Sequence, residues 1–166
     1  NHEAAAAYAR NFDPSRPLHY EGGIRGNWMG SHSLTDVIAP MYPAISAIKG
    51  YATSSKADRP LIMCEYSHAM GNANGTLAEY WDVIESTHGL QGGFIWEFWD
   101  HGPVQTMPDG STRNAYGGDY GEVKHDGNFC CDGMVFPDRT AKPAMHEFKS
   151  IAAPAKITSV KASTGN

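Results

Sequence analysis

The residue best placed for chemistry in this sequence is Glu65, a carboxylate that directly follows the apolar run LIMC at 61–64. Such a run is typical of a strand buried on both faces, as parallel sheets use. A carboxylate at the end of a strand, facing an aromatic-lined cleft, can attack an anomeric carbon or stabilise an oxocarbenium ion. The spacing suits a surface glutamate that caps the following turn equally well, so both interpretations stay open.

Aromatic and imidazole side chains accompany this carboxylate. Flat apolar faces for the C–H side of a sugar ring could come from Tyr42, Tyr66, Trp96 and Trp99. Aromatic residues at strand positions are more often core residues, and periodicity alone favours that interpretation. His68 stands three residues after the carboxylate and could hydrogen-bond a sugar hydroxyl. Asp100 and His101 follow the last aromatic strand, without a role that spacing assigns.

The elements that must position these residues alternate between helix and strand. The periodicity predicts helices over 2–10, 43–52, 76–88 and 143–152, and strands over 18–21, 36–42, 61–64 and 92–99. Thr76 and Glu79 suit a capping box at the start of the third helix. Strands that alternate with helices indicate a parallel sheet of βα units. Residues 101–140 show no sustained period and are rich in glycine, which is typical of a functional or disordered loop.

The predicted strand ends favour a barrel. Tyr42, Glu65 and Trp96 fall at or just past the carboxyl ends of three successive strands, where a (β/α)8 barrel carries its active site. Such a barrel usually needs about 250 residues, so four strands make about half of one. A small open α/β sheet is the alternative that the local pattern leaves open.

Composition excludes several classes of partner. The net charge is −5 and no basic stretch exists, so we expect no nucleic-acid partner. No apolar run approaches the roughly 20 residues of a membrane-spanning helix, so we expect no membrane partner. The N-terminus shows no secretory signal. Cys64, Cys130 and Cys131 are odd in number and two are adjacent, which favours free thiols and a cytoplasmic location.

Six collinear segments resemble the bacterial β-galactosidases of glycoside hydrolase family 2. They are CEYSHAMGN (64–72), LQGGFIWEFWD (90–100), AYGGDYG (115–121), FCCDGMVFPDR (129–139), DPSRPLHYEGG (13–23) and DVIAPMY (36–42). The resemblance implies that residues 1–155 are the C-terminal half of a TIM-barrel catalytic domain, roughly strands 5 to 8 with their helices. Residues 156–166 would begin the following β-rich domain or form a disordered tail.

The resemblance also implies residue roles in a retaining hydrolysis of terminal β-galactosides. Glu65 matches the nucleophile that forms the galactosyl-enzyme, and Tyr42 matches a tyrosine that assists it. The positions that match substrate contacts are Tyr66, Ser67, His68, Trp96 and Asp132.

The family's cations map onto the later loop. A sodium ion would take a backbone oxygen at Phe129 and a side-chain oxygen at Asp132, where the enteric relative has Asn. A magnesium-linked residue would fall near His125 or Asp126.

The family's general acid/base is a Glu in a Gly-Asn-Glu motif that falls before the stretch matching Asn1-His2-Glu3. We therefore expect this chain alone to be inactive on lactose. We also expect a homo-oligomer, because a half barrel exposes strand edges. The alternatives are a non-catalytic carbohydrate-binding or structural fragment, and a sister activity on another β-glycoside.

Overall fold

Two parallel strands form the centre of the computed structural model, which describes residues 1–157 and 159. They are β1 (Leu61–Tyr66) and β2 (Leu90–Ile95), with Leu61 opposite Leu90 and Tyr66 opposite Ile95. Gly93 on β2 lies so close to Met63 that an added Cβ would be 2.8 Å from the Met63 Cβ. A residue without a side chain is needed there for the strands to approach.

Two more segments extend this parallel arrangement without forming regular strands. The Ile62 amide donates to the Ile38 carbonyl at 2.9 Å, and the Asp36 amide donates to the Leu18 carbonyl at 2.9 Å. Isolated parallel bridges join His19 to Val37 and Met41 to Glu65. The predicted strands over 18–21 and 36–42 are therefore reduced to single bridges. Proline at position 40 has no amide to donate, which interrupts the second ladder.

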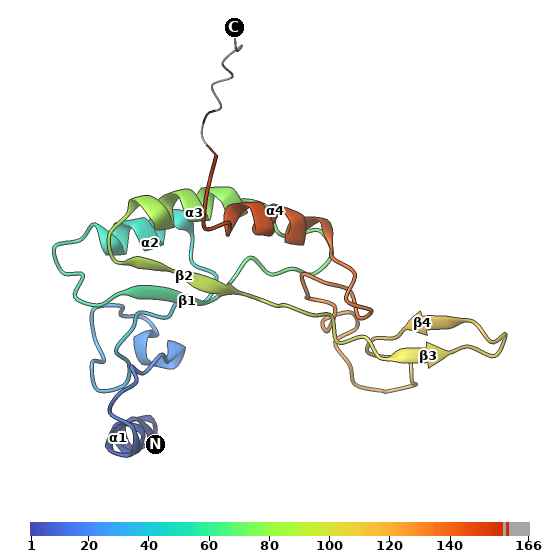
Figure 1. The fold of residues 1–166 in the computed structure, drawn as a ribbon. Helices are drawn as coiled ribbons and strands as arrows, with labels where there is room; N and C mark the ends of the chain where they lie inside the picture. The colour runs from blue at the N-terminus through green and yellow to red at the C-terminus, as the bar shows by residue number, and fades with distance from the viewer. Residues whose placement is uncertain (158, 160–166) are drawn as a thin grey trace, which may run out of the picture.

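Three helices cover one face of the sheet (Figure 1). They are α2 (Ile45–Ala52), α3 (Leu77–Ser86) and α4 (Pro143–Ile151), close to the predicted helices. Ile48 on α2 and Leu77 on α3 are fully buried against the sheet residues Leu61 and Met63. Helices on one side of a parallel sheet are the arrangement that βα units produce.

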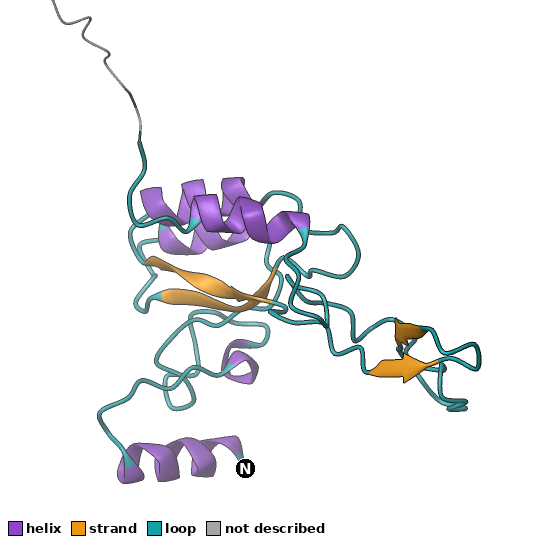
Figure 2. Cartoon of the chain, turned by 45° about the vertical axis from the view of Figure 1, so that its right-hand side comes forward, coloured by secondary structure: helices purple, strands orange, loops and turns teal. Residues whose placement is uncertain are grey.

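The other face of the sheet carries the N-terminal part of the chain. Helix α1 (His2–Phe12) confirms the predicted first helix, and a 3-10 helix, η1 (Glu21–Ile24), follows it. Both lie on the side away from α2, α3 and α4 (Figure 2). Phe94 on β2 is 61% exposed.

The start of α3 differs from the prediction. Thr76 has a left-handed backbone (φ 66°), and its side chain makes no capping hydrogen bond to the helix. Its hydroxyl donates instead to the Gly75 carbonyl at 2.6 Å. The capping box predicted for Thr76 and Glu79 is therefore wrong, because a cap needs an extended residue at this position.

The glycine-rich region 101–140 contains a hairpin that periodicity did not reveal. Strands β3 (Val104–Thr106) and β4 (Thr112–Asn114) pair antiparallel and project away from the sheet (Figure 1). Each strand has three residues and most are exposed, so no alternation of apolar and polar residues marks them.

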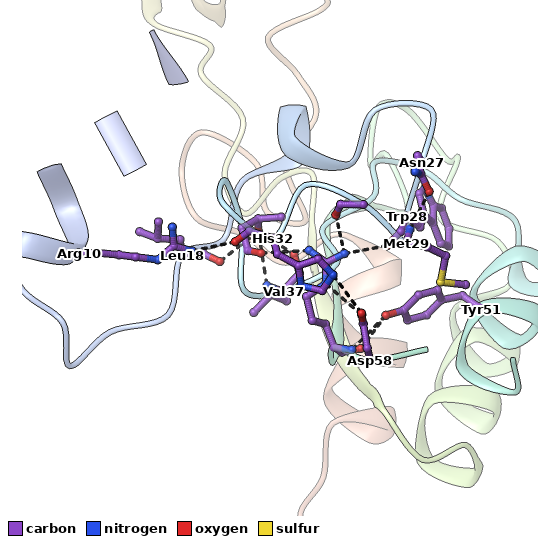
Figure 3. Close-up of polar contacts among 12 residues, drawn as sticks. Arg10, Leu18, Asn27, Trp28, Met29, His32, Val37, Tyr51 and Asp58 are labelled. Carbon is purple, nitrogen blue, oxygen red and sulfur yellow. Dashed lines mark hydrogen bonds and ion pairs between the residues drawn. The ribbon is translucent and has the colours of Figure 1, made fainter. Parts of the chain in front are cut away.

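Arg59 ties the loop after η1 to the sheet. Its guanidinium donates to the backbone carbonyls of Thr35 (3.1 Å), Trp28 (3.1 Å) and Gly30 (2.6 Å). Tyr51 and Asp58 contribute polar contacts at the same point (Figure 3). Within the described part of the chain, no helix has the length and apolar character to cross a membrane.

Candidate active site

The backbone brings three predicted site residues together at the carboxyl ends of the parallel strands. The Tyr42 amide donates to the Glu65 carbonyl at 2.9 Å, and the Trp96 amide donates to the Tyr66 carbonyl at 3.2 Å. Trp96 then accepts from the Ala69 amide at 2.8 Å, and its peptide bond to Glu97 is cis. These contacts lie at the carboxyl ends of parallel segments, which is where α/β enzymes carry their sites.

Two residues at this edge have left-handed backbones, Tyr42 (φ 47°) and Ser67 (φ 51°). Asn74, which is buried, donates from Nδ2 to the Ser67 carbonyl at 2.8 Å and to its hydroxyl at 3.1 Å. Non-glycine residues in this conformation are typical of sites whose surroundings fix them. Asn74 was not among the predicted site residues, because nothing in its spacing distinguishes it from an ordinary loop asparagine.

Tyr42 faces the carboxylates of the site. Burial raises the pKa of its phenol well above the ordinary value, and the neighbouring Glu65 carboxylate raises the pKa further. The charge of Asp132 acts in the same direction. The phenol therefore stays protonated at neutral pH and can donate a hydrogen bond to an anionic neighbour.

His68 lies between two aromatic rings. Its ring centroid is 5.9 Å from that of Tyr42 and 5.3 Å from that of Phe129. Its Nε2 is 3.6 Å from Asp132 Oδ2, and its side chain is 25% exposed. The imidazole is thus partly open to solvent and fixed on three sides, as a group that binds a ligand hydroxyl requires.

Asp132 is the most deeply buried of the predicted site residues that could hold a cation. Trp96 Nε1 donates to its Oδ2 at 3.3 Å, while Oδ1 is buried and has no hydrogen-bond partner. A buried carboxylate oxygen without a partner is costly unless a donor or a cation satisfies it. The carboxylate therefore fits the sodium ligand that the resemblance implies at this position.

The residues around His125 do not define a magnesium site. His125 is exposed, and its Nδ1 accepts from the Gly127 amide at 3.1 Å within the same loop. Across residues 1–157 and 159, no three His, Cys, Asp or Glu side chains are grouped so that they could hold a metal ion. His125 supplies one ligand at most, so magnesium stays a prediction without a defined site.

The Tyr66 side chain lies in the hydrophobic core rather than with the site residues at the strand ends. Its side chain is fully buried, and its hydroxyl accepts from Trp81 Nε1 at 3.0 Å. Its ring packs edge-on against Tyr80 at 5.5 Å between centroids. The predicted contact between this side chain and substrate has no support in the geometry. The register shifts between Met63 and Tyr66, which breaks the alternation along β1 and puts Tyr66 in the same core cluster as Leu61 and Met63.

Glu97 is a second carboxylate near the site that sequence reasoning did not single out. Burial raises the pKa of this carboxyl, and the charges of Asp132 and Asp100 add to the rise while His101 opposes it. His101 Nδ1 lies 3.5 Å from Glu97 Oε1. Its place within the aromatic run, directly after Trp96, was the available signal.

Comparison with known proteins places the chain among glycosidases. The sequence pattern described as "Glycosyl hydrolases family 2, TIM barrel domain" matches residues 1–157. A β-galactosidase of Leuconostoc mesenteroides is 44% identical over 161 residues, as is one of Vibrio vulnificus, and one of Klebsiella pneumoniae is 44% identical over 160. Each match covers 90% of this chain and 15% of the relative, so the chain spans a small part of these proteins' length.

Solved structures show the same fold at lower identity. A β-galacturonidase of Eisenbergiella tayi bound to galacturonate aligns with a TM-score of 0.57 and 14% identity, over 89% of this chain and 29% of that one. A β-glucuronidase of Bacteroides uniformis aligns with a TM-score of 0.54 and 18% identity, over 89% of this chain and 19% of that one.

Proposed function

The chain belongs to the TIM-barrel family of the family 2 glycosyl hydrolases, and from this we propose that it is part of the catalytic domain of a retaining β-galactosidase. The observation that carries the proposal is the placement of Glu65 at the carboxyl ends of the strands, beside Tyr42, whose ring in turn lies next to His68. The 44% identity to β-galactosidases supports galactose as the sugar.

Glu65 acts as the nucleophile. Its carboxylate attacks the anomeric carbon, the bond to the leaving oxygen breaks, and the leaving group departs with the electron pair. Water then attacks the same carbon, the bond to Glu65 breaks, Glu65 leaves as a carboxylate, and the attacking water gives up its proton to solvent. Tyr42 keeps its proton throughout, because burial and the adjacent carboxylate raise its pKa. Its hydroxyl orients the nucleophile by donating to it.

His68 and Trp96 bind the sugar. The Trp96 ring, 39% exposed, offers an apolar face, and its indole N–H is already held by Asp132. A sodium ion on Asp132 and the Phe129 carbonyl would supply a positive charge that orients a sugar hydroxyl. The partnerless Oδ1 of Asp132 supports this assignment.

Retaining hydrolysis needs two carboxyl groups about 5–5.5 Å apart, one of which protonates the leaving oxygen. A leaving group that needs no protonation isolates the role of Glu65. We expect the chain to release 2,4-dinitrophenolate from its β-galactoside while leaving lactose intact. Azide should accelerate turnover and yield β-galactosyl azide, since it intercepts the galactosyl-enzyme without a general base.

The control is Glu65→Gln, which should abolish release of the phenolate. Equal release by this variant would contradict the nucleophile assignment. Faster release from the matching aryl β-glucuronide would replace the galactosidase by a sister activity. Binding of galactose without any release would favour a carbohydrate-binding fragment.

Association and location complete the proposal. Exposed aromatic residues on and beside β2, Phe94 and Phe98, support a homo-oligomer, which light scattering tests. The three free cysteines support a cytoplasmic location.

A further inference from the structure

Residues 130–134, which include Asp132, run beside residues 97–101, which follow β2 in the chain. The Glu97 amide donates to the Asp132 carbonyl at 2.7 Å, and the Met134 amide donates back to the Glu97 carbonyl at 2.8 Å. The His101 amide donates to the Cys130 carbonyl at 2.7 Å. This pairing holds the segment against its neighbour, but a ladder alone tolerates slippage by a residue pair.

One buried ion pair lies at the centre of this pairing. Asp100 Oδ1 accepts from the Gly133 amide at 2.6 Å and from Lys142 Nζ at 2.8 Å. The Asp100 and Lys142 side chains are only 5% and 9% exposed. Lys142 Nζ also lies 3.4 Å from the Cys131 carbonyl, so the ion pair contacts the backbone on both sides of Asp132.

No other residue type fits at position 133. A Cβ on Gly133 would collide with the backbone of Trp99 and Asp100. A residue without a side chain is therefore needed at position 133 for this segment to lie so close to Trp99 and Asp100. The residue directly before Gly133 is Asp132, whose Oδ2 meets the indole of Trp96.

A buried ion pair is a weak source of net stability, because desolvation of both charges offsets their attraction. Its best-attested use is to fix one arrangement among several of similar energy. The contacts above match that role. Lys142 contacts the backbone at residue 131 and Asp100 contacts it at residue 133, while the side chain of Asp132 between them faces Trp96 and His68.

We propose that Asp100 and Lys142 are positioning residues that set the place of the Asp132 carboxylate relative to Trp96 and His68. This inference rests on the proposed function, because both residues would act on catalysis only through Asp132, at a distance from the sugar. The sequence placed Asp100 after the last aromatic strand but gave it no role, and it did not connect Asp100 with Lys142, because the two lie 42 positions apart.

The first test measures position without activity. The full chain is labelled with 5-fluorotryptophan, and the Trp96 resonance in its ¹⁹F NMR spectrum is assigned with Trp96→Phe. Lys142→Met should shift the Trp96 resonance and leave those of Trp28 and Trp81 in place, because these two lie against the helical core. Lys142→Arg should restore the Trp96 resonance.

The matched control is Lys156→Met, which makes the same substitution in an exposed pair with Glu85 at 2.6 Å. It should leave every resonance unchanged. If Lys142→Met does not fold, the double variant Asp100→Asn/Lys142→Met, which removes both charges, takes its place. An unshifted Trp96 resonance in the folded variant, or equal shifts of Trp28 and Trp81, would overturn the proposal.

The second test measures catalysis with a fluorinated, activated galactoside that forms a stable adduct on the nucleophile. Lys142→Met should slow labelling of Glu65 about tenfold or more, and Lys142→Arg should recover most of the rate. Labelling at the wild-type rate would overturn the positioning role and leave the proposed function standing. If the wild-type chain never labels, while Lys142→Met still shifts the Trp96 resonance, the proposed function is overturned instead.

Discussion

Replacement of Arg59 by Met should destabilise the fold measurably while leaving the apolar stem in place. The side chain is 7% exposed and donates to three backbone carbonyls. Hydrogen bonds from a charged group contribute about 1.5–3 kcal/mol each, but they do not add fully. The Thr35 carbonyl belongs to a fully buried residue, whereas Trp28 and Gly30 are partly exposed and can be rehydrated.

We therefore expect a loss of about 3 kcal/mol in the free energy of unfolding, concentrated at the Thr35 oxygen. For a chain of this size that corresponds to a Tm lower by about 6–12 °C. Urea unfolding followed by circular dichroism gives the free energy, and a thermal scan gives Tm.

Arg25→Met is the matched control for this measurement. The Arg25 side chain is 82% exposed and lies 3.8 Å from Glu21, so its loss should change the free energy by less than about 0.5 kcal/mol. If the Arg59 and Arg25 variants unfold at the same urea concentration, the assignment of Arg59 as the anchor of this loop is refuted.

Three further changes test other parts of the structure. Leu77→Ala, at a fully buried core position, should cost about 2–5 kcal/mol in urea unfolding. The pKa of Asp36 is lowered, first by the amide of Leu18 and also by Arg10. The Asp36 carboxylate therefore stabilises the fold above its pKa in the unfolded chain, and this stabilisation is lost as pH falls through its pKa in the folded chain. Asp36→Asn should remove part of the acid destabilisation, a modest part because the carboxylate is 40% exposed. Burial raises the pKa of Glu97, so the protonated carboxyl is favourable to the fold at low pH and this favourable contribution to stability is lost as pH rises. Glu97→Gln should therefore be more stable than wild type near pH 7 and not near pH 4.

Local patterns predicted most of the helices and the central strands. The run before Glu65 predicted β1 because consecutive apolar residues that stop at a carboxylate are typical of a buried parallel strand. The segments at 18–21 and 36–42 were harder, since each pairs only through isolated bridges, and Pro40 interrupts the ladder of the second. The capping box at Thr76 failed because residue types alone do not reveal a left-handed backbone.

The candidate site was predictable only in part. Strand ends predicted the neighbourhood of Tyr42, Glu65 and Trp96, since parallel strands bring their carboxyl ends together. The burial of Tyr66 was not predictable, because alternation from Met63 would place Tyr66 on the opposite face, and a shift in register between the two residues reverses that. The pair Asp100–Lys142 could not be found, because a contact between a loop and a helix start far along the chain has no period.

The nucleophilic role of Glu65 is tested most directly by the intact mass of the chain after incubation with 2,4-dinitrophenyl 2-deoxy-2-fluoro-β-galactoside, followed by peptide mapping. We expect one fluorogalactosyl adduct, located on Glu65 and absent from Glu65→Gln. An adduct on another carboxylate such as Glu97, or no adduct while a full-length family 2 β-galactosidase labels under the same conditions, would contradict that role.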